Sequence, residues 1–529
     1  MRVRRLQGLP IRRSGGRVCS AKRARQDAPF VSFRRKWVFS MADREGLRVN
    51  DPNGLGMPHL IAAIVTAVVG GGVFTMVGDM AHSGAHTGAV LIAWLICGIG
   101  VFALMMCFYG LNRFKPELTG GIYSYARAGF GKFMGFVSAY SYWVSAFMAT
   151  VSYTVLLFAA IGYFFPVFGE GNNLPSMIGA SIIVWICWFL VTRGVKEAAS
   201  VNIVTTIAKI VPIFVALFAI IFAMKFDPQI FMSNFWGTAD GAFNGGDVYN
   251  QIVSVMSVTL WVFLGVEGAV AISGRAKYSK DVGRATVVAF VCILALYLMI
   301  SILSMGVLTQ EELAELPNPA LAGVLEAVVG PWGAMLVNAG VALSLLGSML
   351  GYTLLSSESA FEAAEQGVLP VQFAKHNDKG APIFTVTLTC GIVELFLIAT
   401  IFSASTYQFF YNVSLSLILI PYFFSAFYFV FVTFKKDGID GLSAGRINFY
   451  RVIAIIGAIY SIFLIYSGGL AYFMITTIFI GPGLALYILG EKQRNEPILP
   501  NVGDKIMAAV IVIFFFISVY CIATGIIVP

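Results

Sequence analysis

The sequence predicts an all-α polytopic membrane protein with about thirteen transmembrane helices, of which the first and sixth are broken near the middle. Three observations support this fold class. Of the 529 residues, 58% are hydrophobic and only 12% are charged, which is about half the charge of an ordinary soluble domain. Apolar runs of about 20 residues, the length that crosses a bilayer core, recur along almost the whole chain. Two of these runs, five spans apart, are interrupted by glycines.

Hydropathy places the spans in order along the chain. Their approximate ranges are 58–80, 88–110, 132–160, 175–192, 199–225, 249–273, 284–308, 322–356, 382–402, 406–434, 449–467, 469–490 and 505–527. The eighth run is too long for one crossing, and its polar end, SSESAFEAAEQG, is expected to leave the membrane as an amphipathic extension.

The orientation follows from the basic residues of the short connecting loops. Alternate loops carry Lys and Arg, such as Arg193 and Lys196, whereas the loops between them, for example TQEELAELPNPA, are nearly free of basic residues. This asymmetry predicts a cytoplasmic N-terminus in the cell membrane. Thirteen spans would then leave the C-terminus outside.

The first 40 residues differ from the rest in charge. They hold 12 Lys and Arg and one acid, whereas the remaining 489 residues carry a net charge of −3. This basic leader lacks the apolar core of a secretory signal peptide. It fits either a membrane-surface or nucleic-acid tail or an over-long start, with Met41 opening the chain and residues 41–57 forming a cytoplasmic segment. We favour the second interpretation, and expect no nucleic-acid partner.

Several function classes lack their sequence signals. The seven cysteines show no CxxC spacing, so neither a metal site nor a disulfide framework is indicated. There is no GxxxxGK[ST] loop for an ATP motor. A channel would need a repeated polar or charged ring, and an enzyme a clustered catalytic constellation; neither pattern is evident. We therefore predict no cofactor, no metal and no enzymatic activity, with the lipid bilayer as the chain's surroundings.

Two glycine-rich breaks lie in matching positions of the chain. The first span contains VVGGGVF, with Gly70, Gly71 and Gly72, and the sixth contains TLWVFLGVEGA, with Gly265 and Gly268 around Glu267. Each break opens a block of five spans, 58–225 and 249–434, and an odd number of spans gives the two blocks opposite topology. Such paired breaks mark the binding site of secondary transporters, because unwound backbone at membrane depth is tolerated where it lines a cavity. The spans in 449–529 would be accessory.

These features resemble the amino acid–polyamine–organocation transporters, and most closely the basic amino acid/polyamine antiporters. GGGVF and ELTGGIYSYARAGFG are similar to stretches of that family, and TLWVFLGVEGA followed by SGRAKYSKDVGRAT is similar to the arginine/ornithine exchangers. The resemblance implies the leucine-transporter-like fold of two inverted five-helix repeats. Its commoner count is twelve spans, so a thirteenth departs from the family's pattern.

Trp261 and Glu267 are the leading candidates for the site. An aromatic face suits a guanidinium or ammonium group, and in arginine/agmatine antiporters the matching Trp stacks on the substrate's cationic side chain. A membrane-interface Trp is the alternative, against which its mid-span position argues. An intramembrane carboxylate is a functional hypothesis by default. Glu267 would contact substrate, couple to a proton, or brace unwound backbone.

The resemblance implies further site residues by alignment. Gly70–Gly72 match positions that hold the substrate's α-carboxylate, and Val68 and Leu264 beside the breaks belong to the same set. In the third span, Tyr142 matches a gating aromatic, and Ser145 and Thr150 face the site, with Thr150 replacing an Asn. Two further positions are Tyr352, in the place of a gating Trp, and Ser414 or Ser416, which adds a hydroxyl.

Lys209 is the other intramembrane charge that needs a reason. In sodium-independent members of the family a fifth-span Lys occupies the space of a sodium ion, held by oxygens of the first and eighth spans. Snorkelling to the membrane surface is the alternative for any membrane Lys. Asp79, Glu326 and Glu394 are assigned no role.

The function expected is therefore a secondary exchanger of cationic amino acids working by alternating access, arginine against ornithine. A lysine or polyamine exchanger and a proton-coupled uptake permease are the alternatives within the same fold. Related antiporters are usually dimers, which leaves a homodimer open. The sequence alone does not decide the substrate pair.

Overall fold

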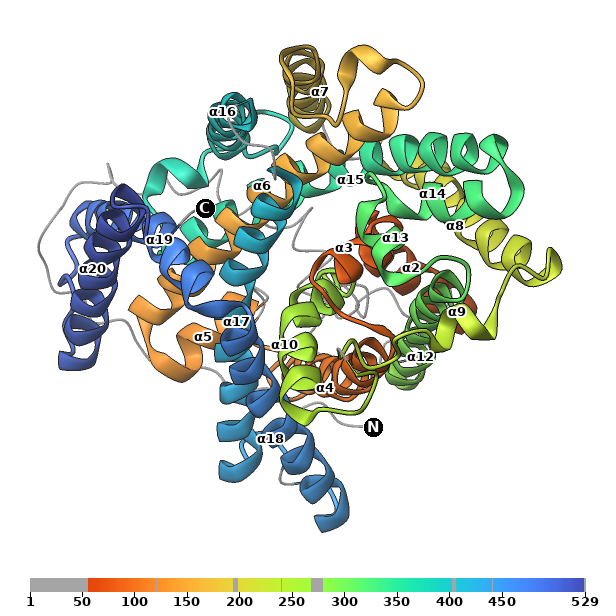
Figure 1. The fold of residues 1–529 in the computed structure, drawn as a ribbon. Coiled ribbons are helices and arrows are strands. Elements are labelled where there is room, and N and C mark those ends of the chain that lie inside the picture. Colours follow the sequence, from red (N-terminus) through yellow and green to blue (C-terminus); the bar gives the residue numbers. More distant parts are fainter. Residues whose placement is uncertain are drawn as a thin grey trace, which may run out of the picture. The chain divides into compact units, whose positions relative to one another are not determined.

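The computed structural model describes residues 56–118, 122–193, 198–238, 240–267, 279–401, 406–439 and 441–527. All of them belong to one structural unit, 51–529. The predicted leader, nearly all of the segment 41–57 and Gly268 lie outside the described residues. Every regular element of the described chain is a helix (Figure 1), as the composition predicts.

Ten helices of the described chain are long and apolar enough to cross a membrane. They are α4 (Thr87–Phe114), α6 (Lys132–Gly162), α7 (Leu174–Arg193), α12 (Ser279–Met305), α15 (Pro331–Glu365), α16 (Ile383–Thr400), α17 (Thr406–Lys435), α18 (Ala444–Ser467), α19 (Gly469–Arg494) and α20 (Val502–Ala523). The other three predicted spans hold α2 (Met57–Val68) with α3 (Met76–His82), α8 (Ala198–Phe222), and α10 (Gly245–Trp261). Ten of the thirteen predicted spans thus contain a helix long enough to cross a membrane. Of the other three, the first and the sixth are interrupted by the predicted breaks, and the fifth holds α8.

The first break separates α2 from α3 where the three glycines stand. α2 ends at Val68, Gly70 adopts an extended conformation, and a short 3₁₀ helix, η3 (Gly71–Phe74), leads into α3. No side chain caps the start of η3. Glycine weakens a helix because its backbone loses the most freedom on ordering and it has no side chain to pack.

The second break begins after Trp261, where α10 ends. Turns with bonds between residues three apart replace the α-helical pattern, as in the bond from Leu264 N to Trp261 O of 3.2 Å. Gly265 has a φ of +98°, a backbone conformation that side chains other than glycine's rarely adopt. The carbonyl of Val262, freed from the helix, accepts a hydrogen bond of 2.8 Å from the hydroxyl of Tyr297 on α12.

The predicted eighth span contains two helices rather than one continuous run. α14 (Ala320–Val329) ends at Gly330, whose φ is +86°, and α15 then starts with Pro331. The positive φ of the glycine and the proline at the first helical position together end one helix and begin the next. The polar tail continues α15 as far as Glu365, in agreement with the expected helical extension.

Shorter helices lie in the connections between the long ones. They are α5 (Ile122–Phe130), η4 (Pro166–Phe168), α9 (Pro228–Met232), α13 (Gln310–Glu315) and η7 (Val371–Ala374). Hydropathy did not predict them, because a short helix in a polar connection carries no long apolar run.

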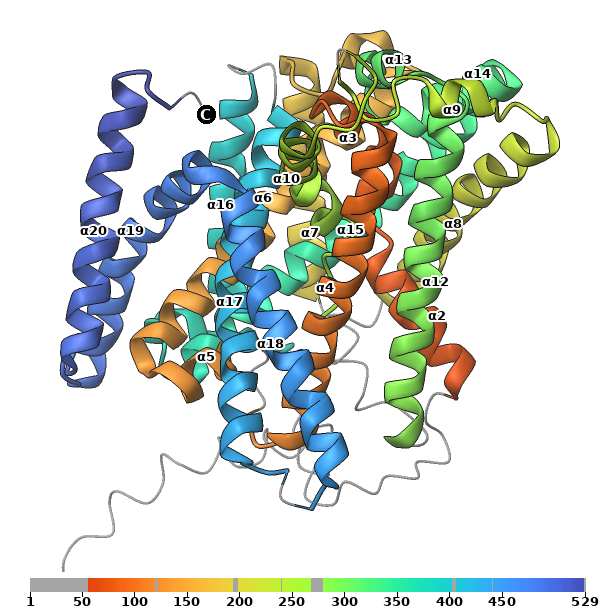
Figure 2. The ribbon, with the colours of Figure 1, turned by 60° about the horizontal axis from the view of Figure 1, so that its bottom comes forward.

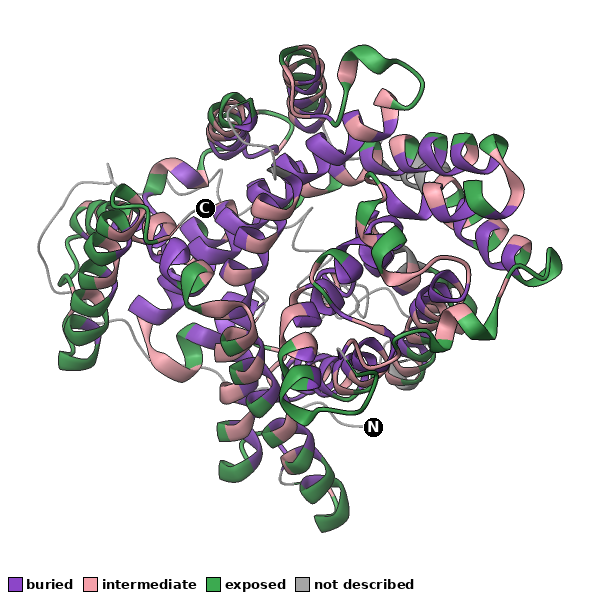
Figure 3. Cartoon of the chain, viewed as in Figure 1, coloured by how far each residue is buried: buried purple, intermediate pink, exposed green. Residues whose placement is uncertain are grey.

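α6 lies at the centre of the packing, between α15 and α17, which are its main neighbours. Figure 3 shows its mostly buried surface, and 89% of its most apolar stretch is buried inside the protein. α10 packs on α4, α2 on α12, and α8 on α15. The residues of both breaks are largely buried, among them Gly71–Phe74 at the first and residues 261–264 at the second.

α20 has the opposite character. Only 11% of its most apolar stretch is buried, and it packs chiefly on α19, beside which it lies in Figure 2. An apolar helix with so little protein cover suits contact with lipid. α20, the last helix of the predicted accessory block 449–529, thus lies away from the central helix α6.

Candidate functional site

The two helix breaks meet at Gly72 and Trp261. A Cβ atom added to Gly72 would lie 2.7 Å from Cδ1 and 2.9 Å from Nε1 of Trp261, closer than such atoms approach one another. Only a glycine therefore lets the indole lie this close to the backbone of η3. The sequence placed both residues in the site, and the structure brings them into contact.

A chain of hydrogen bonds also joins the two breaks. Trp261 Nε1 donates to the hydroxyl of Tyr407 at 3.2 Å, and that hydroxyl lies 3.0 Å from Thr75 Oγ1. Thr75 Oγ1 in turn donates to the carbonyl of Gly72 at 3.2 Å. Since Thr75 uses its proton for Gly72, Tyr407 donates to Thr75 and accepts from Trp261. The chain links α10 to the first break through the start of α17.

Trp261 is surrounded by tyrosine rings. It is 4% exposed, and its ring centroid lies 5.3 Å from that of Tyr411 and 5.7 Å from that of Tyr153. Tyr153 in turn meets Tyr352 edge to face at 5.1 Å. We call Trp261, Tyr153, Tyr352, Tyr407 and Tyr411 the aromatic cluster. These rings are tilted or edge-on to one another rather than stacked, and aromatic faces suit a cation in surroundings with little water.

Glu267 lies in a second group of residues on the far side of the second break. The hydroxyl of Tyr142, on α6, donates to its Oε1 at 3.3 Å, and the hydroxyl of Tyr422, on α17, donates to its Oε2. Two donors to one carboxylate give charge-assisted hydrogen bonds. Glu267 therefore ties the second break to α6 and α17, and it does so through Tyr142, which the sequence predicted as a gating aromatic without predicting this contact.

The predicted hydroxyl groups of α6 and α17 bond to one another or to their own helix. Ser145 Oγ donates to the carbonyl of Ser414 at 2.8 Å, and Ser414 Oγ donates to the carbonyl of Ser145 at 2.9 Å. Thr150 Oγ1 donates to the carbonyl of Ala146 at 3.1 Å. All three hydroxyl-bearing side chains are buried. In this arrangement the hydroxyl protons of Ser145 and Ser414 join α6 to α17, whereas that of Thr150 stays within α6.

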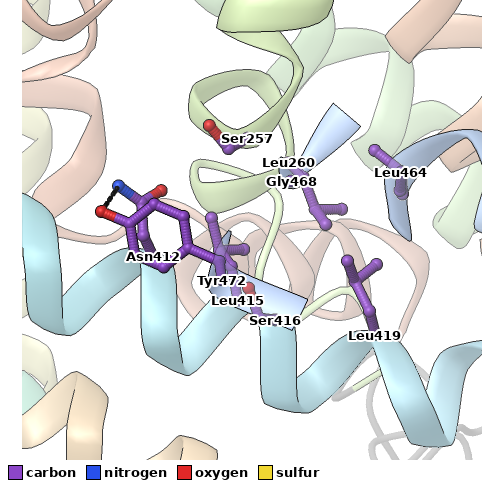
Figure 4. A pocket seen from close by; sticks show the side chains of 9 residues that line it. All are labelled: Ser257, Leu260, Asn412, Leu415, Ser416, Leu419, Leu464, Gly468 and Tyr472. Atoms are coloured by element: carbon purple, nitrogen blue, oxygen red, sulfur yellow. Dashed lines mark hydrogen bonds between the residues drawn. The ribbon is translucent and has the colours of Figure 1, made fainter. Parts of the chain in front are cut away.

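Ser416, the alternative to Ser414, lines a small pocket instead. Figure 4 shows this pocket, which is lined by side chains of α10, α17, α18 and α19 and by Gly468. It lies beside Leu260, the neighbour of Trp261, and within it the amide of Asn412 donates to the hydroxyl of Tyr472 at 3.4 Å. The pocket is therefore next to the aromatic cluster but not part of it.

The remaining predicted residues lie at or directly beside the breaks. Val68 is 3% exposed and Leu264 5% exposed, each directly beside a break. A Cβ atom on Gly70 would lie 3.9 Å from the hydroxyl of Tyr153, which places the first break against the aromatic cluster. On Gly71 it would lie 2.8 Å from Cδ2 of Leu345 on α15.

Lys209 lies on α8 with 7% of its surface exposed. Its helix packs closely on α15: a Cβ atom at Gly340 would lie 2.7 Å from the carbonyl oxygen of Ala208. α15 belongs to the eighth predicted span, one of the two spans whose oxygens the sodium-replacement hypothesis needs.

Several site residues were not predicted from the sequence. Tyr407 and Tyr411 stand four apart at the start of α17, on one face of a helix, and Tyr153 and Tyr422 are further examples. Their spacing was visible, but their position beside the breaks was not. Asp79 was assigned no role, yet it is 4% exposed and bonded to Gln408, the neighbour of Tyr407. Among the described residues no cluster of His, Cys, Asp and Glu that suits a metal ion occurs.

Comparison with known proteins places this arrangement in a family. A family model described as amino acid permease matches residues 55–516. An arginine/ornithine antiporter of Pseudomonas aeruginosa is 42% identical over 464 residues, which are 87% of this chain and 95% of that protein. An arginine/agmatine antiporter of Chlamydia pneumoniae is 35% identical over 452 residues, which are 85% and 92% of the two chains.

The fold has a solved counterpart. The crystal structure of MhsT in complex with L-phenylalanine matches with a TM-score of 0.57 and 11% identity, covering 78% of this chain and 98% of that one. At that identity the likeness shows the fold alone, and it supports the leucine-transporter-like class. The family model matches most of the sequence, and the relatives match over nearly their full length. The chain therefore belongs to the amino acid permease family, within the amino acid–polyamine–organocation superfamily.

Proposed function

We propose that this protein is a secondary exchanger of cationic amino acids in the cell membrane that exchanges arginine for ornithine by alternating access. The observation that carries the proposal is the aromatic cluster at the meeting point of the two helix breaks. A cationic side chain needs an aromatic face or a carboxylate in a site of low water content, and the breaks supply both. The printed names of the most similar relatives support the same substrate class.

The α-amino acid end of the substrate binds the unwound backbone of the first break. The glycines there leave room for a carboxylate, and the start of η3 has no capping side chain. Backbone N–H groups at a helix start favour an anion. Freed carbonyls at the breaks accept from the ammonium group, and Val68 and Leu264 enclose the aliphatic part of the substrate.

The cationic end of the substrate lies against the indole of Trp261. Ser145 and Ser414 serve as polar contacts once α6 and α17 separate, because their hydroxyl protons are used between these two helices in the present arrangement. Thr150, whose hydroxyl now bonds within α6, adds a third contact when it turns toward the substrate. A guanidinium with five donors and an ammonium with three are both accommodated by aromatic faces and backbone oxygens. This tolerance is what an exchanger of two different cations requires.

Two groups of residues act as gates on either side of the substrate. Glu267 with Tyr142 and Tyr422 closes one side, and Tyr352 with Tyr153 closes the other. Lys209 couples the moving helices by holding the space of a sodium ion. Alternating access then requires each gate to open while the other is closed.

The two blocks 58–225 and 249–434 are the inverted repeats that move against each other, with 449–529 as accessory spans. The N-terminus is cytoplasmic, because the basic loops lie on that side. Arginine and ornithine are both monovalent cations near neutral pH. One-for-one exchange therefore moves no net charge, and the gradients of the two amino acids drive it.

Counterflow in proteoliposomes tests this function. Vesicles loaded with unlabelled ornithine should accumulate labelled arginine, and vesicles without internal substrate should not. External lysine, agmatine and putrescine should compete less well than ornithine. Accumulation driven by a proton gradient without internal substrate would instead identify an uptake permease, and preferred exchange of lysine or putrescine would identify the other exchanger.

A further inference from the structure

Asp79 is a buried acid that the proposed cycle does not yet use. It lies on α3, just past the first break, and is 4% exposed. Its Oδ1 accepts one hydrogen bond, of 3.3 Å, from the amide of Gln408, and its Oδ2 is buried without a donor. Its polar neighbours Thr75, Gln408 and Asn318 are all uncharged. None of the ion pairs in the described part of the chain includes it.

Asp79 is close to the aromatic cluster. It follows Thr75 by one helical turn, about 6 Å along the axis, and Thr75 is hydrogen-bonded to Tyr407. Its donor Gln408 is the next residue after Tyr407 on α17. Asp79 is therefore connected to Trp261 through both α3 and the start of α17.

Glu267 provides an instructive contrast with Asp79. Both are carboxylates within predicted spans, but each oxygen of Glu267 accepts from a tyrosine hydroxyl, whereas one oxygen of Asp79 is buried without a donor. An ionised carboxylate out of water is costly unless an opposite charge or several donors compensate it. Asp79 is thus the carboxylate of the site that gains most from a nearby cation.

We propose that Asp79 carries the negative charge that a cationic substrate must neutralise before the helices close around the aromatic cluster. This inference rests on the exchange function proposed above. When arginine or ornithine lies against the aromatic cluster, its positive charge offsets the free-energy cost of keeping the Asp79 carboxylate out of water. Without a substrate, burying the charge is unfavourable, so the empty protein does not cross between its two states. Asp79 is then the residue that makes exchange obligatory.

The test separates exchange from leak. Proteoliposomes loaded with labelled arginine are diluted into buffer with or without ornithine, and the ratio of the two efflux rates is the coupling ratio. Asp79→Asn keeps the shape and removes the charge, so leak into ornithine-free buffer should rise at least fivefold and the coupling ratio should fall by a similar factor. Glu311→Gln is the matched control: α13 packs on α3, but Glu311 is exposed and should leave the ratio unchanged.

A second measurement uses citrulline, the uncharged analogue of arginine. Unmodified protein should discriminate strongly against citrulline in uptake, and Asp79→Asn should narrow this discrimination at least fivefold. An unchanged coupling ratio together with unchanged discrimination overturns the proposal. A sodium requirement that disappears in Asp79→Asn also overturns it, because Asp79 would then hold a metal ion.

If Asp79→Asn does not reach the membrane, Gln408→Met replaces it. This change removes the hydrogen bond that Gln408 donates to Oδ1 of Asp79, so burying the Asp79 carboxylate without a substrate becomes less favourable. Efflux of arginine into ornithine-free buffer should therefore be slower than in the unmodified protein. Leak equal to or above that level overturns the proposal. Absence of exchange in the unmodified protein would instead refute the proposed function itself.

Discussion

Gly72 and Trp261, 189 positions apart in the chain, touch each other at the point where both broken helices are unwound. The contact is closed into a ring by hydrogen bonds from the indole through Tyr407 and Thr75 back to the carbonyl of Gly72. The backbone of the first break therefore helps to hold Trp261 in place, and Trp261 in turn helps to hold the first break. The position of the indole depends on the absence of a side chain at Gly72.

Gly72→Ala should displace the Trp261 ring. The added Cβ would overlap Cδ1 and Nε1, and neither the buried ring nor the backbone of η3 has free space to move into. We expect arginine affinity to fall about tenfold or more, equivalent to about 1.4 kcal/mol. Gly391→Ala, where a Cβ meets nothing within 4 Å, is the control and should bind normally. Normal binding by both variants would show that the contact is not needed.

Trp261 should contribute through its ring face. A cation–π contact in a desolvated site is worth about 2 kcal/mol, or roughly thirtyfold in affinity. Trp261→Phe should therefore retain weak binding of arginine, and Trp261→Leu should lose more. Equilibrium binding to purified protein measures both. Trp185→Leu, a change at a 41% exposed indole of α7, should have no effect, and normal binding in Trp261→Leu would rule out stacking.

Glu267 should depend on its charge rather than its shape. Glu267→Gln keeps a hydrogen-bonding side chain but gives Tyr142 and Tyr422 a neutral acceptor in place of a carboxylate, and bonds to a neutral acceptor are weaker. We expect slower exchange or a flatter dependence of the exchange rate on pH, with arginine binding less affected than after Trp261→Leu. The test is the exchange rate of Glu267→Gln and of the unmodified protein, measured across pH. Unaltered exchange at every pH would reduce Glu267 to a brace for unwound backbone.

The role proposed for Lys209 predicts that the rate of exchange does not depend on sodium. If its ammonium takes the place of a sodium ion, replacing sodium by choline should leave exchange unchanged. Lys209→Ala should then impair turnover more than arginine affinity, because the change removes a tie between elements that move. Lys225→Ala, at an exposed position just after the same helix, provides the comparison. A strong sodium requirement in the unmodified protein would contradict this role.

An ion-pair network at the end of α19 should matter for stability. Glu491, 1% exposed, pairs with Lys132 and Arg494, each at 2.9 Å. Glu491→Gln leaves two cations without their buried partner, and breaking such a pair costs about 3 kcal/mol of unfolding free energy. Unfolding of the purified protein in mixed detergents measures the loss.

Glu496 of the same network is exposed and provides the comparison. Its hydrogen bond from Lys132 holds the pKa of the Glu496 carboxyl below its usual value of 4.5. A lowered pKa means that the contribution is present above pH 4.5 and is lost as the pH falls through the lowered value. Glu496→Gln should therefore destabilise much less than Glu491→Gln, and only above that pH range. Equal losses would show that burial is not the deciding factor.

The breaks illustrate what could be predicted before the structure. Gly70–Gly72 and Gly265 stand inside apolar runs, and their effect on a helix depends on the residues themselves, so both breaks appear where the sequence predicted them. Trp261 and Glu267 were also identified locally, because they stand beside the second break within an apolar span. Gly330 was overlooked: its positive φ and the following proline divide the eighth predicted span, although the dipeptide was visible in the sequence.

The hydroxyl groups show where sequence reasoning stops. Ser145, Thr150 and Ser414 were predicted by alignment to face the site. The structure pairs Ser145 with Ser414, and bonds Thr150 to its own helix. Which face of α6 meets α17 depends on the rotation of two long helices that are apolar nearly all round, and such helices carry little amphipathic signal.

The sequence by itself thus determined the membrane class, most of the helix positions, the two breaks and the aromatic and acidic residues within them. These properties depend on apolar length, glycine content and charge within stretches of about 20 residues. Only the tertiary structure decided that Gly72 supports Trp261, that Tyr407 closes the ring of hydrogen bonds, and that Asp79 lies beside it. Those contacts join residues tens to hundreds of positions apart, and they depend on how the helices rotate and slide against one another when they pack.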